Sequence, residues 1–328
     1  MLVSAAAVRR LVAVPGVTVR ENAPLSQYTR FGIGGPALIL CDANCERALV
    51  SALAVVQEAE LPWMVIGGGT NLVVSDSGFE GVVLRYTGAR LARNGNTLQV
   101  EAGAILQDVV DRSIQLGLKG METMTGIPGY LGGAIYGNAG AYGHSIQERV
   151  RQVRLFDGRR ILSFSNDDCQ FRYRESVFKM RKEWVILSCD LAFDSGGSDD
   201  LARTSLEIRA IRDAKYPPTM KCAGSIFKNL LLADLPVSVA AAIPAKVVRE
   251  GKVPSAWFLE QTGAKGLRRG DIQVAEYHAN LVYNDGAGTA ADLVAVIEEL
   301  KAGVRDRFGI ELEEEVQYVG FDYAPAPA

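Results

Sequence analysis

The stretch TGIPGYLGGAIYGNAGAYG, from Thr125 to Gly143, contains seven glycines among nineteen residues. Glycine in an ordered loop costs conformational entropy and adds no side-chain packing, so a run this dense needs a reason. One reason is that a backbone without Cβ atoms can approach an anion closely and point N–H groups at it. A flexible linker is the alternative, but linkers lack large apolar groups, and Ile127, Tyr130 and Tyr136 interrupt this stretch. We therefore favour an ordered phosphate-binding loop.

A second glycine cluster, Gly67, Gly68 and Gly69, follows the short apolar run 63–66. A strand that ends in three glycines suggests backbone amides facing a phosphate, and a tight turn is an equal alternative. The cluster is not the dinucleotide fingerprint G-x-G-x-x-G, and it lacks the lysine of a P-loop. Two such loops in one domain mean more than either alone, because a dinucleotide has two phosphates to hold.

The chain has 328 residues, which is enough for two or three domains. Its formal net charge of −3 provides no basic field for nucleic acid or anionic lipid. No uncharged apolar run reaches the roughly 18 residues of a membrane span. Arg9 and Arg10 interrupt the apolar N-terminus where a signal peptide needs an unbroken core. We expect a cytoplasmic protein with no membrane span and no nucleic-acid partner.

Cysteine and histidine are too sparse for most metal or triad chemistry. The five cysteines are scattered along the chain: Cys41, Cys45, Cys169, Cys189 and Cys222. Cys41 and Cys45 are close, but no second close pair completes a zinc site, so buried reduced thiols are the better interpretation. His144 and His278 are the only histidines, and we treat both as structural. We predict no metal site.

Apolar periodicity predicts helices and strands that mix without regular βα alternation, which fits an α+β fold better than a doubly wound sheet. The predicted helices are 4–14, 44–60 with Asn44 as its cap, 104–116, 201–212, 240–248 with a break at Pro244, 255–261 and 289–308. The predicted strands are 37–40, 63–66, 81–86, a hairpin over 91–100, 150–156, 161–164, 185–193, 279–284 and 310–320. Pro217 and Pro218 place a domain boundary near residue 215, and 323–328 reads as a frayed tail.

Seven segments in order resemble the UDP-N-acetylenolpyruvoylglucosamine reductase family, flavoenzymes of peptidoglycan precursor synthesis. They span nearly the whole chain, and each alone is a modest signal. The segments are YTRFGIGGPA (28–37), VIGGGTNLVVSD (65–76), GIPGYLGGAIYGNAGAYG (126–143), YRES (173–176), AGSIFKN (223–229), GAKGLRRGDIQVAEYHANLVYN (263–284) and GIELEEEVQYVG (309–320).

The resemblance implies a fold, a cofactor and a reaction. The fold is α+β, with an FAD-binding domain of the vanillyl-alcohol-oxidase (PCMH) type in two subdomains and a smaller α+β substrate-binding domain. Its expected parts are an N-terminal helix (1–22), the FAD domain (23–195, split near 87), a connecting helix (196–214), the substrate domain (215–308), and a returning strand with a tail (309–328). NADPH is expected to reduce noncovalently bound FAD, which then reduces UDP-N-acetylglucosamine enolpyruvate to UDP-N-acetylmuramate.

Hydride addition to an enolpyruvyl double bond leaves negative charge beside the carboxylate, so the reaction needs a cation, a hydrogen-bond donor and a proton source. The resemblance assigns these to Arg174, Glu315 and Ser225. A guanidinium grips a carboxylate through two hydrogen bonds, and a glutamic acid held protonated can donate. A serine is a poor acid that needs a nearby cation or hydrogen-bond network. Without the resemblance, Arg174 reads as a surface arginine, Ser225 as a turn residue, and 313–315 as a solvated edge strand.

The resemblance also assigns residues to the cofactor and the substrate. Those for FAD are Arg30, Gly67, Gly68, Gly69, Asn71, Gly126, Ile127, Pro128, Gly129, Asn138, Gly140 and Ala141. Those for the nucleotide sugar are Tyr173, Lys215, Asn229 and Gln261. A lysine point charge suits a diphosphate, although a boundary lysine and a helix-cap asparagine are the plain alternatives for Lys215 and Asn229.

The spacing of Arg174 and Ser225 is too short for the tyrosine-bearing loop found in one branch of the family, so the chain resembles the other branch. The segment 230–254 is longer than usual there, and we predict an extra helix in the substrate domain. Two other functions remain as alternatives. One is an FAD-dependent sugar or alcohol oxidase, and the other is a non-catalytic nucleotide-sugar sensor. The retained Arg174, Ser225 and Glu315 argue against both.

Overall fold

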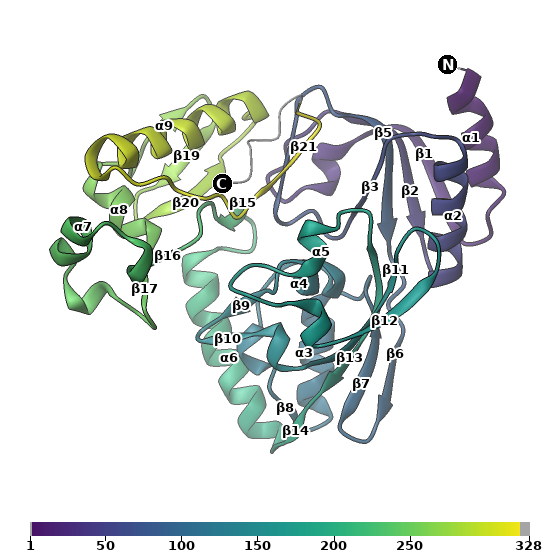
Figure 1. Cartoon of the computed structure of the whole chain (residues 1–328), viewed down its shortest axis with the longest axis horizontal. Coiled ribbons are helices and arrows are strands. Elements are labelled where there is room, and N and C mark those ends of the chain that lie inside the picture. The colour runs from purple at the N-terminus through teal and green to yellow at the C-terminus, as the bar shows by residue number, and fades with distance from the viewer. Residues whose placement is uncertain (1, 322–328) are drawn as a thin grey trace. The chain divides into compact units, whose positions relative to one another are not determined.

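The structure is a computed structural model that describes residues 2–321, with side chains from residue 5 onward. Figure 1 follows the chain from its N-terminal helix to its last strand. The chain divides into two compact units. Unit 1 comprises Met1–Ala23, Ala37–Gly69 and Glu80–Pro218, and unit 2 comprises Pro24–Pro36, Thr70–Phe79 and Thr219–Ala328. The predicted tail at 323–328 lies outside the described residues.

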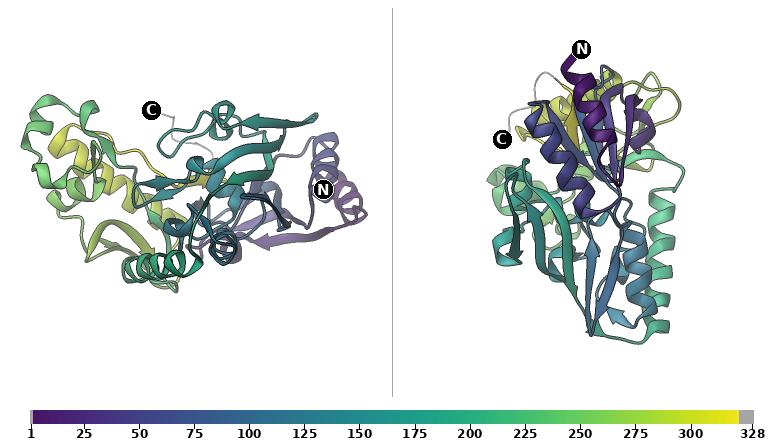
Figure 2. Two further views of the ribbon diagram at one scale, coloured as in Figure 1. Left: turned by 90° about the horizontal axis from the view of Figure 1, so that it is seen from below. Right: turned by 90° about the vertical axis from the view of Figure 1, so that its right-hand side faces the viewer.

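The first sheet of unit 1 has four strands in the order β1-β2-β5-β3. They are β1 (Val17–Pro24), β2 (Pro36–Ala43), β3 (Trp63–Ile66) and β5 (Phe79–Tyr86). β3 pairs in parallel with β5. Helices α1 (Leu2–Val12) and α2 (Glu46–Glu58) pack against each other, as both views of Figure 2 show. The strands predicted at 63–66 and 81–86 are confirmed.

The predicted cap of α2 is wrong. The helix begins at Glu46 with Cys45 at the N-cap position and no side-chain capping bond. Asn44 is instead engaged by the turn after α1, where its backbone N–H donates to the Gly16 carbonyl at 3.0 Å. Gly16 has φ +85°, and a Cβ there would lie 2.4 Å from Asn44 Oδ1. The close approach of these two residues explains the glycine and fixes Asn44 outside the helix.

The second sheet of unit 1 has five strands in the order β12-β11-β13-β7-β6, and every neighbouring pair is antiparallel. Its strands are β6 (Leu91–Asn94), β7 (Thr97–Glu101), β11 (Val150–Phe156), β12 (Ile161–Ser165) and β13 (Val185–Ala192). The predicted hairpin over 91–100 is therefore confirmed. Buried residues from both sheets and from α1 to α6 belong to one apolar core, which fixes the loops between the strands.

The glycine-rich stretch 125–143 is ordered. It contains helix α4 (Leu131–Tyr136), whose Leu131 and Ile135 are fully buried, and the paired strands β9 (Gly140–Ala141) and β10 (His144–Ser145). A linker would not bury such side chains. The prediction that residues 125–143 are ordered is confirmed, and the alternative of a flexible linker is wrong.

Helices α3 and α6 of unit 1 contact each other and lie side by side in Figures 1 and 2. Helix α3 (Leu106–Gln115) buries Val109, Val110 and Ile114 on one face. Helix α6 (Ser198–Lys215) starts three residues before the predicted 201, so 198–200 are helical and not loop. Asp199 and Asp200 in its first turn favour this earlier start, because acidic groups stabilise a helix N-terminus. The short elements around them are β8 (Leu118–Lys119), η2 (Glu122–Met124), η3 (Ile146–Glu148), η4 (Asp167–Cys169), α5 (Val177–Met180) and β14 (Asp194–Ser195).

Unit 2 is built on a four-stranded antiparallel sheet in the order β15-β20-β19-β18. Its strands are β15 (Lys221–Ser225), β18 (Arg268–Arg269), β19 (Ile272–Ala275) and β20 (His278–Asn284). Helices α8 (Ser255–Gln261) and α9 (Ala290–Phe308) pack on it. Thr289 caps α9 by accepting the Asp292 N–H at 3.1 Å, so the predicted helix 289–308 is confirmed. Unit 2 also includes the short 3-10 helix η1 (Leu25–Tyr28), which comes from the N-terminal part of the chain.

The predicted strand 310–320 is wrong over most of its length. Only β21 (Gln317–Val319) is a strand, and it pairs in parallel with β4 (Leu72–Val74). Before it, Glu314 forms a single β-bridge with Phe227. The segment changes its partner between these two contacts, from residues 226–228 to residues 71–74, so it cannot form one continuous ladder.

The segment 230–254 is an excursion that closes on itself. Its ends, β16 (Leu230–Leu231) and β17 (Lys252–Val253), pair antiparallel. Between them lie η5 (Leu232–Asp234), α7 (Val237–Ala242) and η6 (Ala245–Val247). The predicted extra helix exists, but it starts and ends earlier than 240–248, and the break at Pro244 divides it from a 3-10 turn.

Candidate active site

The predicted site residues fall on both units. Unit 1 contains Gly67, Gly68, Gly69, Gly126, Ile127, Pro128, Gly129, Asn138, Gly140, Ala141, Tyr173, Arg174 and Lys215. Unit 2 contains Arg30, Asn71, Ser225, Asn229, Gln261 and Glu315. Lys215 and Gln261 are exposed, whereas Asn138 is buried and Arg174, Ser225 and Glu315 are half-buried. Each unit therefore contains its own set of predicted site residues.

In unit 2, Ser225 and Glu315 lie on adjoining backbone segments. The Glu315 N–H donates to the Ile226 carbonyl at 2.7 Å, and the Lys228 N–H donates to the Glu313 carbonyl at 2.9 Å. These two bonds flank the bridge between Phe227 and Glu314. Residue 225 therefore starts the segment on which residue 315 is held, so the structure brings two of the three predicted catalytic residues together.

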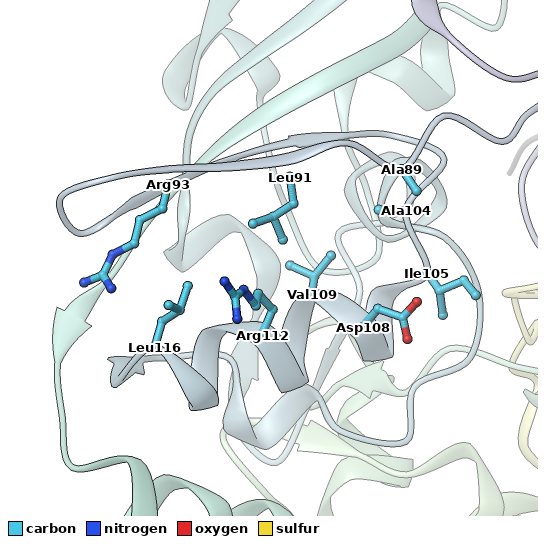
Figure 3. A pocket seen from close by; sticks show the side chains of 9 residues that line it. All are labelled: Ala89, Leu91, Arg93, Ala104, Ile105, Asp108, Val109, Arg112 and Leu116. Atoms are coloured by element: carbon cyan, nitrogen blue, oxygen red, sulfur yellow. The ribbon is translucent and has the colours of Figure 1, made fainter.

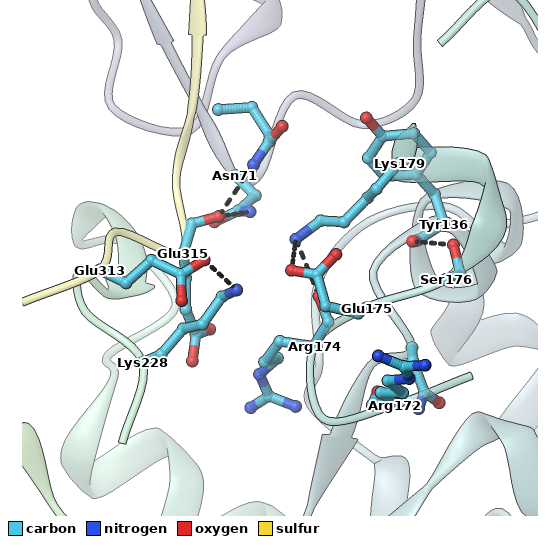
Figure 4. Close-up of polar contacts among 12 residues, drawn as sticks. Asn71, Tyr136, Arg172, Arg174, Glu175, Ser176, Lys179, Lys228, Glu313 and Glu315 are labelled. Atoms are coloured by element: carbon cyan, nitrogen blue, oxygen red, sulfur yellow. Dashed lines mark hydrogen bonds and ion pairs between the residues drawn. The ribbon is translucent and has the colours of Figure 1, made fainter. Parts of the chain in front are cut away.

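The three glutamates of 313–315 have different surroundings, as the left half of Figure 4 shows in part. Glu313 forms an ion pair with Lys228, whose side chain is largely buried. Glu314 pairs at 3.0 Å with Lys301 of α9, and both side chains are 11% exposed. The neighbouring carboxylates of Glu313 and Glu314 therefore meet different partners. The partners of Lys228 and Lys301 could not be predicted from the sequence, because an ion pair between distant segments leaves no local pattern.

Burial alone lowers the pKa of Lys301, but its hydrogen bond to Glu314 and the nearby carboxylates of Glu298 and Glu311 raise that pKa above the ordinary value. The ammonium group is consequently charged across the physiological range. It ties α9 to the segment that carries Glu315.

Asn229 has a structural role in unit 2. Its Oδ1 accepts the Ser255 N–H at 3.4 Å, at the start of α8. Asn229 precedes β16 and is not the N-cap residue of a helix, since the N-cap position of α8 is Pro254. Its predicted contact with substrate stays a prediction, as does that of Gln261 at the end of the same helix.

In unit 1, Arg174 sits in a strained turn beside the glycine stretch. Its φ of +59° is uncommon for a residue with a side chain. Arg172 and Glu175 exchange both backbone hydrogen bonds around it, at 3.0 and 3.1 Å. The Arg174 guanidinium donates to the Gly140 carbonyl at 3.1 Å and lies 5.3 Å from the centre of the Tyr173 ring. Strain of this kind is often kept at functional sites, because the surroundings hold the residue in place.

Three further side chains fix this turn, two of which are labelled on the right of Figure 4. The Lys179 ammonium donates to the Arg174 carbonyl at 2.8 Å and to Glu175 Oε1 at 3.1 Å. The Ser176 hydroxyl donates to the Tyr136 carbonyl at 2.6 Å. Asn138, predicted to contact FAD, donates to the Arg172 carbonyl at 2.8 Å. The glycine stretch and the YRES turn are therefore one connected structure, and Lys179 is a member that the sequence did not reveal.

The two glycine loops of unit 1 are neighbours. A Cβ on Gly67 would lie 3.5 Å from the Cβ of Tyr130, the N-cap residue of α4. Gly69 and Gly129 have φ of +62° and +115°, so both positions require glycine-like backbone. Their adjacency supports the argument that the two loops act on one ligand.

Gly126 is enclosed by α3 and α6. Its N–H donates to Gln107 Oε1 at 2.7 Å, and Arg209 donates to the same oxygen at 3.3 Å. A Cβ on Gly126 would lie 3.2 Å from the Cδ atoms of Arg209 and Arg212. Gly126 also has φ +74°, a backbone conformation that favours glycine, and the nearby arginine side chains add to the crowding. Gln107 is a contact that the sequence analysis did not anticipate.

A separate cavity of about 340 Å³ lies in unit 1 between the β6–β7 hairpin and α3, as Figure 3 shows. It is lined by Ala89, Leu91, Arg93, Ala104, Ile105, Asp108, Val109, Arg112 and Leu116. This lining includes none of the residues predicted to bind cofactor or substrate.

The described cysteines are all free, and all but Cys45 are buried. Burial raises the pKa of Cys41 and of Cys169 to about 12, so these thiols are unreactive at neutral pH. Between residues 2 and 321, no group of three or more His, Cys, Asp or Glu side chains is placed to hold a metal ion. Within the same residues, no helix combines the length and the apolar character that crossing a membrane requires.

Comparisons with known proteins identify related sequences and a related solved structure. Residues 216–319 match the family model for the UDP-N-acetylenolpyruvoylglucosamine reductase C-terminal domain, and residues 37–159 match that for an FAD binding domain. The UDP-N-acetylenolpyruvoylglucosamine reductase of Solibacter usitatus is 57% identical over 95% of this chain and 100% of its own length. The protein of that name from Rubrobacter xylanophilus is 35% identical over 90% of this chain and 94% of its own. The crystal structure of UDP-N-acetylenolpyruvylglucosamine reductase from Thermus caldophilus has a TM-score of 0.72 at 26% identity, covering 92% of this chain and 98% of that one.

The matches to an FAD binding domain and to a reductase C-terminal domain define an FAD-dependent oxidoreductase. More narrowly, the chain belongs to the UDP-N-acetylenolpyruvoylglucosamine reductase family. The predicted fold class and the predicted family are both confirmed.

Proposed function

We propose that this chain reduces the enolpyruvyl group of UDP-N-acetylglucosamine enolpyruvate to give UDP-N-acetylmuramate, a precursor of peptidoglycan, with NADPH as the hydride donor. The observation that carries the proposal is 57% identity to a reductase of that name along its whole length. FAD, when bound, relays the hydride between the two substrates. An oxidase on the same scaffold is less well supported, because the C-terminal domain matches the reductase family.

The residues of unit 1 suit a bound FAD. Gly67 packs near Tyr130, so the two glycine loops adjoin, and positive φ at Gly69 and Gly129 frees the backbone to approach a ligand. We propose that the predicted FAD residues of both loops hold its diphosphate, with Arg30 and Asn71 from unit 2 as further contacts. In the same terms, we propose that 23–195 is the FAD domain and 215–308 the substrate domain, which the matches at 37–159 and 216–319 support.

We propose that Arg174 binds the substrate carboxylate and spreads the charge that develops beside it. Its turn is already braced by Lys179 and by the Arg172–Glu175 backbone pair, so the side chain needs little reorganisation. Ser225 then delivers a proton to the carbon, and a protonated Glu315 donates a hydrogen bond to the developing charge. Lys215, Asn229, Gln261 and Tyr173 contact the nucleotide sugar.

We also propose a cytoplasmic location, where the five free thiols stay reduced. The proposed function is tested by the colour of the bound flavin. The purified protein should be yellow, NADPH should bleach it without oxygen, and UDP-N-acetylglucosamine enolpyruvate should restore the colour. A protein that never takes up FAD, or one that oxygen but not this substrate reoxidises, would contradict the proposal.

Replacing Ser225 by Ala separates catalysis from mere binding. Bleaching by NADPH should survive, because it needs no proton at the substrate carbon, whereas restoration of colour by the enolpyruvyl ether should collapse. A non-catalytic sensor would show no turnover to lose in the parent protein.

A further inference from the structure

The buried side chain of Asn280 makes the two main-chain hydrogen bonds that a neighbouring strand would make, at a residue close to Ser225. Its Oδ1 accepts the Phe227 N–H at 2.9 Å, and its Nδ2 donates to the Phe227 carbonyl at 2.9 Å. Asn280 is 2% exposed and Phe227 is fully buried. One primary amide therefore satisfies both main-chain polar groups of a single buried residue.

The backbone of β15 explains why a side chain is needed there. β15 and β20 pair regularly at Cys222 and Tyr283, but the register shifts before Ser225 meets Leu281. Gly224, with φ +79°, lies in this bulge. The Ile226 N–H still reaches the Asn280 carbonyl at 3.1 Å, and beyond it the chain has left the regular ladder. The Asn280 side chain then supplies the next pair of hydrogen bonds.

The opposite edge of the same segment supports Glu315. Residues 226–228 hydrogen-bond to 313–315 through the Glu315 N–H and the Lys228 N–H, at 2.7 and 2.9 Å. The segment 226–228 is thus held on one edge by Asn280 and on the other by the strand-like 313–315. Its position sets where Ser225 and Glu315 lie relative to each other.

We propose that Asn280 is a positioning residue for proton delivery, acting through Phe227 to fix Ser225 against Glu315. This inference rests on the proposed function, in which Ser225 protonates the substrate carbon. Asn280 touches neither cofactor nor substrate in this role. Its amide is required because it offers a donor and an acceptor side by side, and Phe227 presents the complementary pair.

Asn280→Asp gives a test with its own pH signature. The carboxylate accepts from the Phe227 N–H but repels the Phe227 carbonyl, whereas the carboxylic acid has an O–H donor and restores both bonds. Burial favours the neutral acid and raises its pKa, so both bonds return as the pH falls. The charged and titratable groups carried by β20 and by the elements paired with it or packed on it here are all present in the parent protein too: Lys221 on β15, Glu260 on α8, His278 on β20, and Lys228, Glu313 and Glu315 on the segments that flank Phe227.

The measurement is the rate at which UDP-N-acetylglucosamine enolpyruvate reoxidises the NADPH-reduced holoenzyme, relative to the parent at the same pH. At about pH 8 this ratio should fall by roughly tenfold to a hundredfold, the cost of a small displacement of a reacting group. It should recover at least in part by about pH 6, where the acid is neutral. The rate of bleaching by NADPH should stay close to that of the parent.

Asn280→Leu and Leu293→Ala complete the set. Asn280→Leu has no polar group to restore, so its reoxidation should be slow at every pH, with an enlarged solvent isotope effect because proton delivery limits the rate. Leu293 is a buried core residue of α9, and Leu293→Ala serves as the control for lost stability in unit 2. It should lower the unfolding temperature without a selective loss of reoxidation.

The proposal is overturned if Asn280→Asp follows the parent's pH profile, or if both half-reactions slow equally in the Asn280 variants. It is also overturned if Leu293→Ala reproduces their selective loss. Failure of the proposed function looks different, because the parent protein itself would then not be reoxidised by the enolpyruvyl ether.

Discussion

Asn71 donates from Nδ2 to the main-chain carbonyl of Glu315 at 2.7 Å, although the two residues are 244 positions apart. The Gln317 N–H returns a bond to the Asn71 carbonyl at 2.9 Å. Together with the parallel pairing of β4 and β21, these bonds hold the C-terminal segment beside the residues that follow the triple glycine. A residue assigned to the cofactor from its motif therefore also fixes the proposed hydrogen-bond donor of the reaction.

Replacing Asn71 by Asp should separate these two roles. The carboxylate cannot donate to the Glu315 carbonyl, and repulsion between the two oxygens should loosen the segment. We expect a loss of about 1–3 kcal/mol in unfolding free energy, as for a part-buried acceptor left without its donor, and slower reoxidation by substrate. Urea unfolding and stopped-flow absorbance measure these effects. A variant that loses FAD affinity alone, with unchanged reoxidation once saturated, would show that the bond to Glu315 is unimportant.

The sequence predicted the regular parts of this fold well, and the reason is physical. The strand Trp63–Ile66 is a continuous apolar run, and the helix Ala290–Phe308 has its own N-cap at Thr289, so both signals are local. The prediction of a strand over 310–316 was wrong because the conformation of this segment is set by contacts with residues 226–228 and Lys301, which lie far away in sequence. Local pattern cannot report such partners.

The same distinction applies to the site. Arg174, Ser225 and Glu315 came from a resemblance, since an arginine, a serine and a glutamate in polar surroundings say little alone. Asn280 and Lys179 support these residues from elsewhere in the chain. Their roles emerge only from hydrogen bonds to main-chain atoms, which no spacing in the sequence encodes.

Arg174→Lys should impair substrate chemistry while leaving the first half-reaction intact. Lysine keeps the charge but loses the planar fork that binds a carboxylate through two bonds. We expect reoxidation by UDP-N-acetylglucosamine enolpyruvate to slow by about a hundredfold, the usual range for removal of one stabilising donor. Bleaching by NADPH should be unchanged. Arg172→Lys is the matched control, because that side chain is exposed two positions away, and it should behave like the parent. Equal losses in both variants would contradict the assignment.

Lys301→Met should strongly destabilise unit 2, because it leaves the Glu314 carboxylate buried without its partner. Breaking a buried ion pair typically costs about 3–5 kcal/mol. The double variant Lys301→Met with Glu314→Leu should recover much of this loss, since apolar groups of similar size then fill the space. Denaturant unfolding of the parent and both variants measures the difference. A double variant no more stable than the single one would contradict this account.

The stabilisation from Lys301 should also depend on pH in a defined direction. Its pKa is raised above the ordinary 10.5 in the folded protein. The contribution is therefore complete below 10.5 and is lost as the pH rises through the raised value. Unfolding free energies of the parent and Lys301→Met, compared from neutral to strongly alkaline pH, should converge only at the alkaline end. Convergence of the two unfolding free energies as the pH is lowered from neutral would have the wrong sign.

Gly224→Ala tests whether the bulge before Ser225 is needed for catalysis rather than for folding alone. Gly224 has φ +79°, and a Cβ there would meet no atom within 4 Å, so the cost is backbone strain without a clash. Gly309, at the end of α9, has φ +66° and equally open surroundings. Both alanine variants should therefore lose about 1–2 kcal/mol of stability. Only Gly224→Ala should slow reoxidation by substrate, because relaxation of the strained residue shifts Ser225. If Gly309→Ala slows the same step as much, or Gly224→Ala leaves it unchanged, the bulge does not position the proton donor.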